Sequence, residues 1–199
     1  MKFILGKKLE MTQMFDEKGD VVPVTLIEAG PCFILQVKTK EKDGYEAIQI
    51  GYEKILKEKN IKRPQKKKPY RYVKEARTEG HDVKEGDEIN TSIFKEGERV
   101  AVAGISKGKG FAGAVKKWHF RGRCSTHGTK HEERSLGSRG SRFPQRTTPG
   151  RKGPGRMGTQ RVTVKNLKII KSDAEKNILV LKGAVPGRRG TLLEIKGLI

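Results

Sequence analysis

Several kinds of residue are scarce in this sequence. Only two cysteines, Cys32 and Cys124, occur among 199 residues, so a disulfide framework is excluded and a reducing, cytoplasmic compartment is indicated. No stretch approaches the roughly 18 consecutive apolar residues of a membrane-spanning helix. The first apolar run is only Phe3-Ile4-Leu5, without a small-residue cleavage site after it, so no signal peptide is expected.

Carboxylates are missing altogether from Arg134 to Arg161. This segment holds eight Lys/Arg, six Gly and three Pro, and its only large apolar residues are Leu136, Phe143 and Met157. Fixing one residue's backbone costs roughly 1–2 kcal/mol of conformational entropy, and the segment buries too little to offset that cost. We expect it to stay disordered or to take its order from a partner.

Positive charge is abundant and concentrated. The chain has 44 Lys/Arg against 23 Asp/Glu, a formal net charge of +21, and residues 104–160 account for 14 of the bases and two of the acids. A compact protein with this charge repels itself, which points to an anionic partner. An apolar content of 34% permits one modest core.

Alternating apolar residues predict strands in the first hundred residues. Val22, Val24 and Leu26 alternate before a Gly30-Pro31 turn, and Phe33, Leu35 and Val37 alternate after it, which predicts a hairpin. Ile48, Ile50 and Tyr52 share one face of a further strand, Gly86-Asp87 marks a turn, and ERVAVAGI continues the β pattern. The lysine-rich stretch at about 54–72 is interpreted as a solvated excursion with a short helix.

The β pattern returns after the arginine-rich segment, in RVTVKNLKII, NILVLKGAV and TLLEIKGLI. We therefore predict one closed or nearly closed antiparallel β domain made of residues 1–103 and 161–199, since an open sheet of this size would leave edges to protect. Residues 104–160 are predicted to form a long, basic, irregular arm that leaves this domain and contains a short helix.

Motifs typical of enzymes fail on their context. GKGFAG matches G-x-G-x-x-G, but the following RGRCSTHGTKH offers neither the long helix nor the second strand of a dinucleotide site. GISKGKGF has the wrong spacing for a P-loop and lacks its Ser/Thr. No nucleophile or acid–base arrangement is recognisable. We predict that the protein is not an enzyme, and that it has no cofactor and no small-molecule substrate.

One pattern resembles a metal site. His119, Cys124, His127 and His131 are spaced H-x4-C-x2-H-x3-H, which offers four zinc ligands. Structural zinc sites usually use two or more thiolates, and flanking Lys and Arg residues oppose a dication. Histidines that face RNA are favoured, and no metal is predicted.

A short helix is predicted within FAGAVKKWHF. Phe111, Ala114, Val115 and Trp118 follow the i, i+3, i+4, i+7 spacing of one apolar stripe. The simpler interpretation docks this stripe on the β domain, while a functional one also turns the neighbouring lysines toward phosphates.

The spacing of arginines between glycines and prolines favours RNA as the partner. Such a chain is narrow and extended, and its guanidinium groups suit bidentate phosphate contacts. The glycines and prolines prevent the sustained amphipathic helix of a membrane-binding segment, and duplex DNA is usually read by a folded helix or ribbon. RNA, with clefts between packed helices, fits better, and no membrane partner is expected.

Several segments together carry a family resemblance. LGKKLEMTQMFDEKGD, AGPC, VAGISKGKGFAGAVKKWHF, HGTKHEERSLGSRG and GRMGTQRVTVKNL, taken in order, closely resemble the bacterial-type ribosomal protein L3 family. The resemblance implies a six-stranded β-barrel of the translation-protein type, early assembly on large-subunit rRNA, neighbouring large-subunit ribosomal proteins as partners, and a loop that runs toward the peptidyl transferase centre.

The candidate rRNA-binding residues lie in and beside the arm: Lys107, Lys109, Lys116, Lys117, Trp118, His119, Arg121, Arg123, His127, Lys130, His131, Arg134, Arg139, Arg142, Arg146, Arg151, Lys152, Arg156 and Arg161. The competing interpretation is a free-standing RNA chaperone or nucleoid-type protein, for which a basic disordered arm suffices. A single internal arm between two halves of one β domain argues against it.

Overall fold

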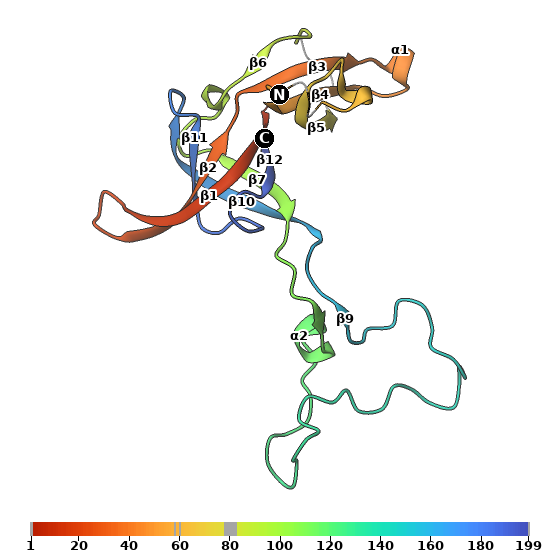
Figure 1. Ribbon diagram of the computed structural model, residues 1–199. Coiled ribbons are helices and arrows are strands. Elements are labelled where there is room, and N and C mark those ends of the chain that lie inside the picture. The colour runs from red at the N-terminus through yellow and green to blue at the C-terminus, as the bar shows by residue number, and fades with distance from the viewer. Residues whose placement is uncertain (1, 58, 60, 78–82, 199) are drawn as a thin grey trace. The chain divides into compact units, whose positions relative to one another are not determined.

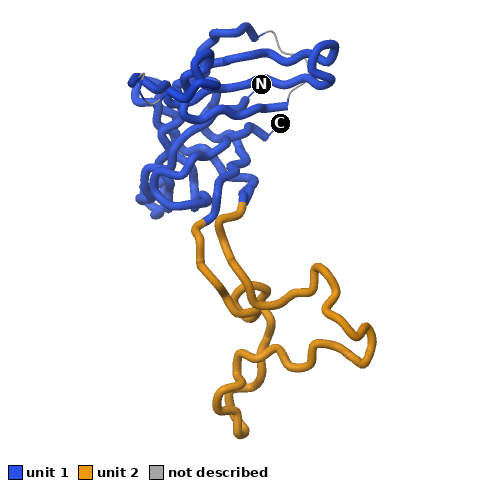
Figure 2. The backbone as a smooth tube through the Cα atoms, turned by 45° about the vertical axis from the view of Figure 1, so that its right-hand side comes forward, with its two compact units in different colours: residues 1–106, 161–199 blue, residues 107–160 orange. Residues whose placement is uncertain are grey.

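The chain forms two compact units. The computed structural model describes residues 2–57, 59, 61–77 and 83–198. Residues 1–106 and 161–199 make one unit, here called the β unit, and residues 107–160 make the other, here called the loop unit (Figure 2). The sequence-based boundaries were placed after residues 103 and 160. That the two units are separate domains stays a prediction.

Six antiparallel strands of the β unit form a sheet that closes on itself (Figure 1). Their order is β1 (Phe3–Phe15), β12 (Leu192–Gly197), β7 (Arg99–Ile105), β10 (Arg161–Asp173), β11 (Ile178–Lys182) and β2 (Val21–Ala29), which pairs again with β1. Register shifts interrupt the β1–β2, β10–β7 and β10–β11 pairs. Such irregularities bend and twist strands, which helps a small sheet to close.

A second antiparallel sheet lies between β2 and β7 in the sequence. Its order is β5 (Tyr70–Arg77), β4 (Ala47–Lys54), β3 (Cys32–Lys38) and β6 (Glu88–Ile89). The short helix α1 (Lys40–Asp43) joins β3 to β4, and two 3₁₀ turns, η2 (Arg63–Gln65) and η3 (Thr91–Ile93), occur in the connections. The mainly β, antiparallel class is therefore as predicted.

Two details of the predicted arrangement are wrong. The strands on either side of Gly30-Pro31 do not form a hairpin, because β2 already has β1 on one edge and β11 on the other, whereas β3 pairs with β4 and β6. Strands β3, β4, β5 and β6 also do not join the closed sheet. Both errors have the same cause, since alternation of apolar residues predicts a strand but not the edge with which it pairs.

The lysine-rich excursion is shorter than predicted. Strand β4 runs to Lys54 and β5 begins at Tyr70, so the connection covers residues 55–69, of which 58 and 60 lie outside the described residues. Leu56 in this connection is 88% exposed. Tyr72, at the end of the predicted excursion, is a strand residue paired with Tyr52.

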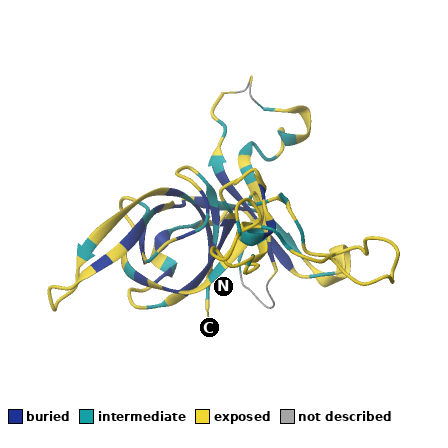
Figure 3. Ribbon diagram, turned by 90° about the horizontal axis from the view of Figure 1, so that it is seen from below, coloured by how far each residue is buried: buried dark blue, intermediate teal, exposed yellow. Residues whose placement is uncertain are grey.

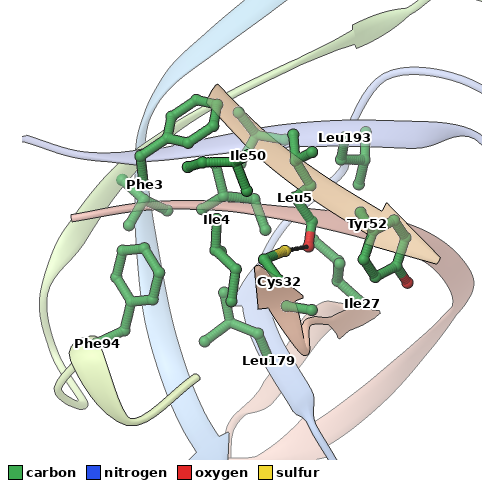
Figure 4. Packing of buried hydrophobic residues seen from close by; sticks show 14 of the residues in the cluster. Phe3, Ile4, Leu5, Ile27, Cys32, Ile50, Tyr52, Phe94, Leu179 and Leu193 are labelled. Carbon is green, nitrogen blue, oxygen red and sulfur yellow. Dashed lines mark hydrogen bonds between the residues drawn. The ribbon is translucent and has the colours of Figure 1, made fainter. Parts of the chain in front are cut away.

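One continuous hydrophobic core joins the two sheets of the β unit (Figure 4). Ile4 and Leu5 of β1 pack with Ile50 and Tyr52 of β4, and with residues of β2, β11 and β12. The predicted inward face of β4 is confirmed, since Ile48, Ile50 and Tyr52 are all buried. Each large aliphatic side chain removed from water contributes roughly 1.5–3 kcal/mol, so this cluster dominates the stability of the β unit.

Candidate nucleic-acid interface

The loop unit has little regular structure. Strands β8 (Phe111–Ala112) and β9 (Gly155–Arg156) pair with each other, and helix α2 (Ala114–Trp118) follows β8. The Lys109 amide donates to the Met157 carbonyl at 2.9 Å, and the Met157 amide donates to the Gly110 carbonyl at 2.9 Å. These bonds hold the outgoing and returning segments side by side near the base of the unit.

Two glycines allow the segments of the loop unit to approach closely. A Cβ atom at Gly158 would lie 2.1 Å from the Lys107 carbonyl oxygen, and one at Gly122 would lie 2.4 Å from the Glu133 carbonyl oxygen. Both glycines have positive φ, +80° and +76°, a conformation that other residues rarely adopt. Backbone hydrogen bonds and close backbone approach, more than apolar burial, therefore join the segments of this unit.

The predicted helix is shorter than its apolar stripe. It begins at Ala114, after the extended Gly113, and ends where His119 adopts a left-handed φ of 60°. Phe111 belongs to β8 and is 79% exposed, so it is not part of a helical stripe, whereas Ala114 is buried. The extended backbone at Gly113 separates Phe111 from the helix. Docking of the remaining stripe on the β unit stays a prediction.

Trp118 connects the helix to the returning segment. Its indole N–H donates to the Gly153 carbonyl oxygen at 2.8 Å. The Lys117 and Lys152 ammonium groups lie 5.2 and 5.6 Å from the centroid of the Trp118 ring, within cation–π range. The contact places two cations beside an aromatic ring that remains 40% exposed.

One of the two carboxylates of the loop unit lies beside an arginine. Arg123 forms an ion pair with Glu132, and its backbone amide donates to the Glu133 carbonyl at 2.9 Å. Arg123 is therefore a weaker candidate for a phosphate contact than its unpaired neighbours. Among the described residues of this unit, the other arginines and lysines have no carboxylate within ion-pair distance, which leaves a net positive surface.

An open hollow of about 540 Å³ lies within the loop unit. Its charged lining residues are Arg123, Arg134, Arg139 and Glu132, so cations outnumber anions three to one. Pro154 and Leu136 supply apolar wall. The lining of this hollow is therefore positively charged overall.

Glycines also leave room for guanidinium groups. A Cβ atom at Gly140 would lie 3.3 Å from one terminal nitrogen of Arg151, and one at Gly153 would lie 3.1 Å from a terminal nitrogen of Arg139. The two arginines are thus each packed against the bare backbone of the opposite segment. A side chain at either glycine would therefore crowd the guanidinium group beside it.

Almost all of the nineteen predicted rRNA-binding residues are exposed; only Lys117 is half-buried. Eighteen of them lie in the loop unit. Arg161 differs, since it begins β10 in the β unit and its guanidinium lies 2.5 Å from the Glu194 carboxylate, which also pairs with Lys74 at 3.4 Å. The sequence does not predict this pairing.

His119, Cys124, His127 and His131 are all exposed. Within the described ranges, no group of three or more His, Cys, Asp or Glu side chains lies close enough to hold a metal ion. His119 and His127 both have left-handed backbone conformations, with φ of 60° and 58°, and serve as turn residues. That the H-x4-C-x2-H-x3-H pattern holds no metal stays a prediction.

Sequence reasoning missed two features. The Trp118–Gly153 hydrogen bond joins residues far apart in the chain, and no local pattern indicates it. The first hairpin, residues 9–23, carries an acidic tip in a basic protein, a signal visible in the sequence.

In the part of the chain that the structure describes, no helix is long and apolar enough to span a membrane.

Known proteins similar to this chain are ribosomal. Large ribosomal subunit protein uL3 of Carboxydothermus hydrogenoformans is 51% identical over 203 residues, covering 98% of this chain and 96% of that protein. The uL3 proteins of Chloroherpeton thalassium and Dehalococcoides mccartyi are 48% and 46% identical, and cover 98% and 97% of this chain and 98% and 96% of their own lengths. The family model for ribosomal protein L3 matches residues 79–177.

These similarities define a structural ribosomal protein and not an enzyme. Identity near one half extends over nearly the full length of both chains, which is far more than a shared motif requires. The chain belongs to the ribosomal protein L3 family. The resemblance predicted from the sequence is thus confirmed.

Proposed function

We propose that this protein is a constituent of the large ribosomal subunit that binds large-subunit rRNA chiefly through the loop unit. It takes part in early assembly and extends its basic loop toward the peptidyl transferase centre, which it shapes during translation. One observation carries the proposal: the loop unit has fourteen Lys/Arg against two Glu, and all but one of these cations are free of carboxylate partners among the described residues.

In this proposal, the β unit is the folded domain from which the loop unit extends. We infer that its closed six-stranded sheet is a barrel of the translation-protein type and that the two units are the two domains of the protein. The closed antiparallel order supports the first point. The second is supported by the pairing of Ile105 with Arg161, since the chain leaves and re-enters the sheet on adjacent strands.

The loop unit gains from RNA what it cannot supply itself. Its regular elements are two-residue strands and a five-residue helix, so its own burial is too small to offset the entropy of ordering. Phosphates neutralise its arginines, and release of the counterions condensed on RNA drives that step. Trp118, with a partly exposed ring flanked by two lysines, offers a surface on which a base can stack.

The salt dependence of binding tests the interface. Each neutralised phosphate contributes about 0.7–0.9 to the slope of log affinity against log salt concentration, so contacts by about ten side chains give a slope of about seven to nine. The measurement is a titration of protein-free large-subunit rRNA with the purified chain at several salt concentrations. A slope of about one or two would contradict the proposal, because it would mean that most of these charges face solvent.

A matched pair of variants controls for net charge. Arg142→Ala with Arg146→Ala removes two exposed charges from the loop unit, and Lys40→Ala with Lys42→Ala removes two exposed charges from α1 of the β unit. The first pair is expected to lower the slope by about 1.4–1.8 and the second to leave it nearly unchanged. Equal effects would show that binding follows overall charge.

Sedimentation separates the ribosomal role from that of a free RNA chaperone. In a gradient of cell extract at moderate salt, the protein is expected to co-migrate with large subunits. A spread over free RNA would contradict the ribosomal assignment. Crosslinking followed by sequencing of the attached RNA then identifies the helices contacted, and nucleotides of the peptidyl transferase region are expected among them.

A further inference from the structure

The hairpin of β1 and β2 continues beyond the closed sheet. Strand β12 pairs with β1 only from Phe3 to Lys7, and β11 pairs with β2 only from Glu28 to Val24. The outer part of the hairpin, residues 9–23, projects from the β unit in Figure 1 and again in Figure 3, where most of it is exposed. We call residues 9–23 the outer hairpin.

The two faces of the outer hairpin differ. Met14 and Val22, on one face, belong with Val24 and Val180 to a small hydrophobic cluster. The other face carries Phe15 and its register partner Val21, which are 71% and 55% exposed. Met11, on the same face of β1, is 49% exposed. The paired Phe15 and Val21 therefore form an exposed apolar patch, a feature typical of an interaction surface.

The charge of the outer hairpin is opposite to that of the protein. It holds Glu10, Asp16, Glu17 and Asp20 against one lysine, Lys18, in a chain of net charge +21. Glu10 pairs with Arg189 at 3.0 Å. Among the described residues, the carboxylates at the tip, Asp16, Glu17 and Asp20, have no cation within ion-pair distance. Such a surface repels phosphate and attracts cationic side chains.

One edge of the outer hairpin is open. From Leu9 to Phe15, β1 pairs only with β2, and none of the other described strands covers its second edge. This stretch, LEMTQMF, has neither the lysine nor the proline that commonly protects an exposed edge. An edge of this kind can accept a further strand, whose backbone hydrogen bonds give affinity while side-chain contacts give specificity.

We propose that the outer hairpin binds an extended, Lys/Arg-rich segment of another protein of the large subunit, which adds to the open edge of β1, covers Phe15 and Val21, and places cations beside Glu17 and Asp20. The proposal rests on the proposed function, because it takes the ribosomal subunit as the setting. Residues 134–161 of this chain show that a protein bound to rRNA can carry a segment of the required chemistry. RNA itself is disfavoured by the sign of the charge.

Site-specific photocrosslinking tests the partner's identity. Phe15 is replaced by a benzoylphenylalanine residue in the full chain, the variant is incorporated into large subunits, and the crosslinked peptides are identified by mass spectrometry. The expected product is a covalent link to an extended Lys/Arg-rich segment of another large-subunit protein. The same probe at Leu56, an 88% exposed residue of the lysine-rich connection, is the control and is not expected to give that product.

Three results would overturn the proposal: a link from position 15 to rRNA, a link to a second copy of this chain, or no link in subunits that contain the variant. If the variant is absent from large subunits altogether, the proposed function itself fails, so the two failures are distinguishable. Phe15 is an exposed residue, so its replacement leaves the core intact.

A charge-reversal pair tests the contribution of the acidic tip. Glu17→Lys with Asp20→Lys is expected to lower the yield of the protein crosslink by about fivefold, because it replaces exposed ion pairs with like-charge repulsion. Glu96→Lys with Glu175→Lys makes the same charge change at exposed positions elsewhere in the β unit and is expected to leave the yield unchanged. An equal loss in both variants, or none in the first, would contradict the electrostatic part of the proposal.

Discussion

Ile105 and Arg161 lie opposite each other on the paired strands β7 and β10, although all of residues 106–160 separate them in the chain. The loop unit is therefore an insertion between two neighbouring positions of one sheet. Arg161 also fixes this point by its ion pair with Glu194 of β12. The hydrogen bonds of the closed sheet therefore do not depend on the sequence of the insertion.

Replacing residues 107–160 by a short Gly/Ser linker is expected to leave the β unit folded. The linker has only to join adjacent strands, and the entropy of loop closure changes slowly with length. The hydrophobic core of the two sheets contains no residue of the loop unit. Cooperative thermal unfolding, measured by far-ultraviolet circular dichroism, checks the prediction, and its loss would show that the insertion is part of the folding unit. Affinity for large-subunit rRNA is expected to fall sharply.

Trp118 is the only tryptophan in the chain, so its fluorescence reports on the loop unit alone. We expect its emission to change at a lower urea concentration than the circular dichroism of the strands. Its anchor is one hydrogen bond to Gly153 and two cation–π contacts, whereas the β unit has an extensive apolar core. Coincident transitions in the free protein would contradict this prediction. Trp118→Phe removes the indole N–H, and with it the hydrogen bond to the Gly153 carbonyl. This change is expected to weaken RNA binding without changing the strand transition.

The two cysteines are expected to differ in reactivity. Burial raises the pKa of the Cys32 thiol to about 12, against a weaker opposing effect of its hydrogen bond to the Leu5 carbonyl at 3.5 Å. At pH 8 only about one Cys32 side chain in ten thousand would be a thiolate, the reactive form. Cys124 is exposed. Alkylation followed by peptide mapping is expected to modify Cys124 in the folded protein and Cys32 only after denaturation; rapid labelling of both would contradict the burial.

The raised pKa of Cys32 also affects how the stability of the protein depends on pH. Because the pKa of Cys32 is higher in the folded state than the ordinary thiol value of about 8.5, its contribution is fully present below that pH and is lost as pH rises toward 12. Cys32→Ala is therefore expected to lose less thermal stability than the natural chain between pH 8 and 11. Equal losses in both proteins would show that other groups alone determine the alkaline limit.

Arg142 and Arg146 are expected to shape RNA and to do no chemistry. Both are exposed, and no described carboxylate pairs with either. Large subunits carrying Arg142→Ala with Arg146→Ala are expected to assemble, to show altered chemical reactivity of nucleotides in the peptidyl transferase centre, and to have a modestly changed rate of peptide-bond formation. Lys40→Ala with Lys42→Ala is the control. Unchanged reactivity and rate would contradict the prediction, and complete loss of activity in assembled subunits would contradict it too.

Local residue patterns determined much of this protein. Alternation of apolar residues predicted the strands and the buried face of β4, because a strand's period of two is a property of the backbone itself. The concentration of Lys and Arg in residues 104–160 predicted the loop unit, because charge can be counted from the sequence without knowledge of the fold. Segments spread over the chain, from MTQ to GRMG, identified the family, which the identity to known uL3 proteins confirms.

Strand pairing was decided only in three dimensions. The sequence predicts β2 and β3 as a hairpin, but β2 takes β1 and β11 as neighbours, and β3 enters a second sheet. Which strand edges pair depends on how the whole core is buried, and Ile4 and Leu5 belong to a core that joins both sheets. No local pattern of residues encodes this burial. The same reason applies to Trp118 with Gly153, to Arg161 with Glu194, and to the outer hairpin, whose open edge becomes visible only when every other strand has found its partner.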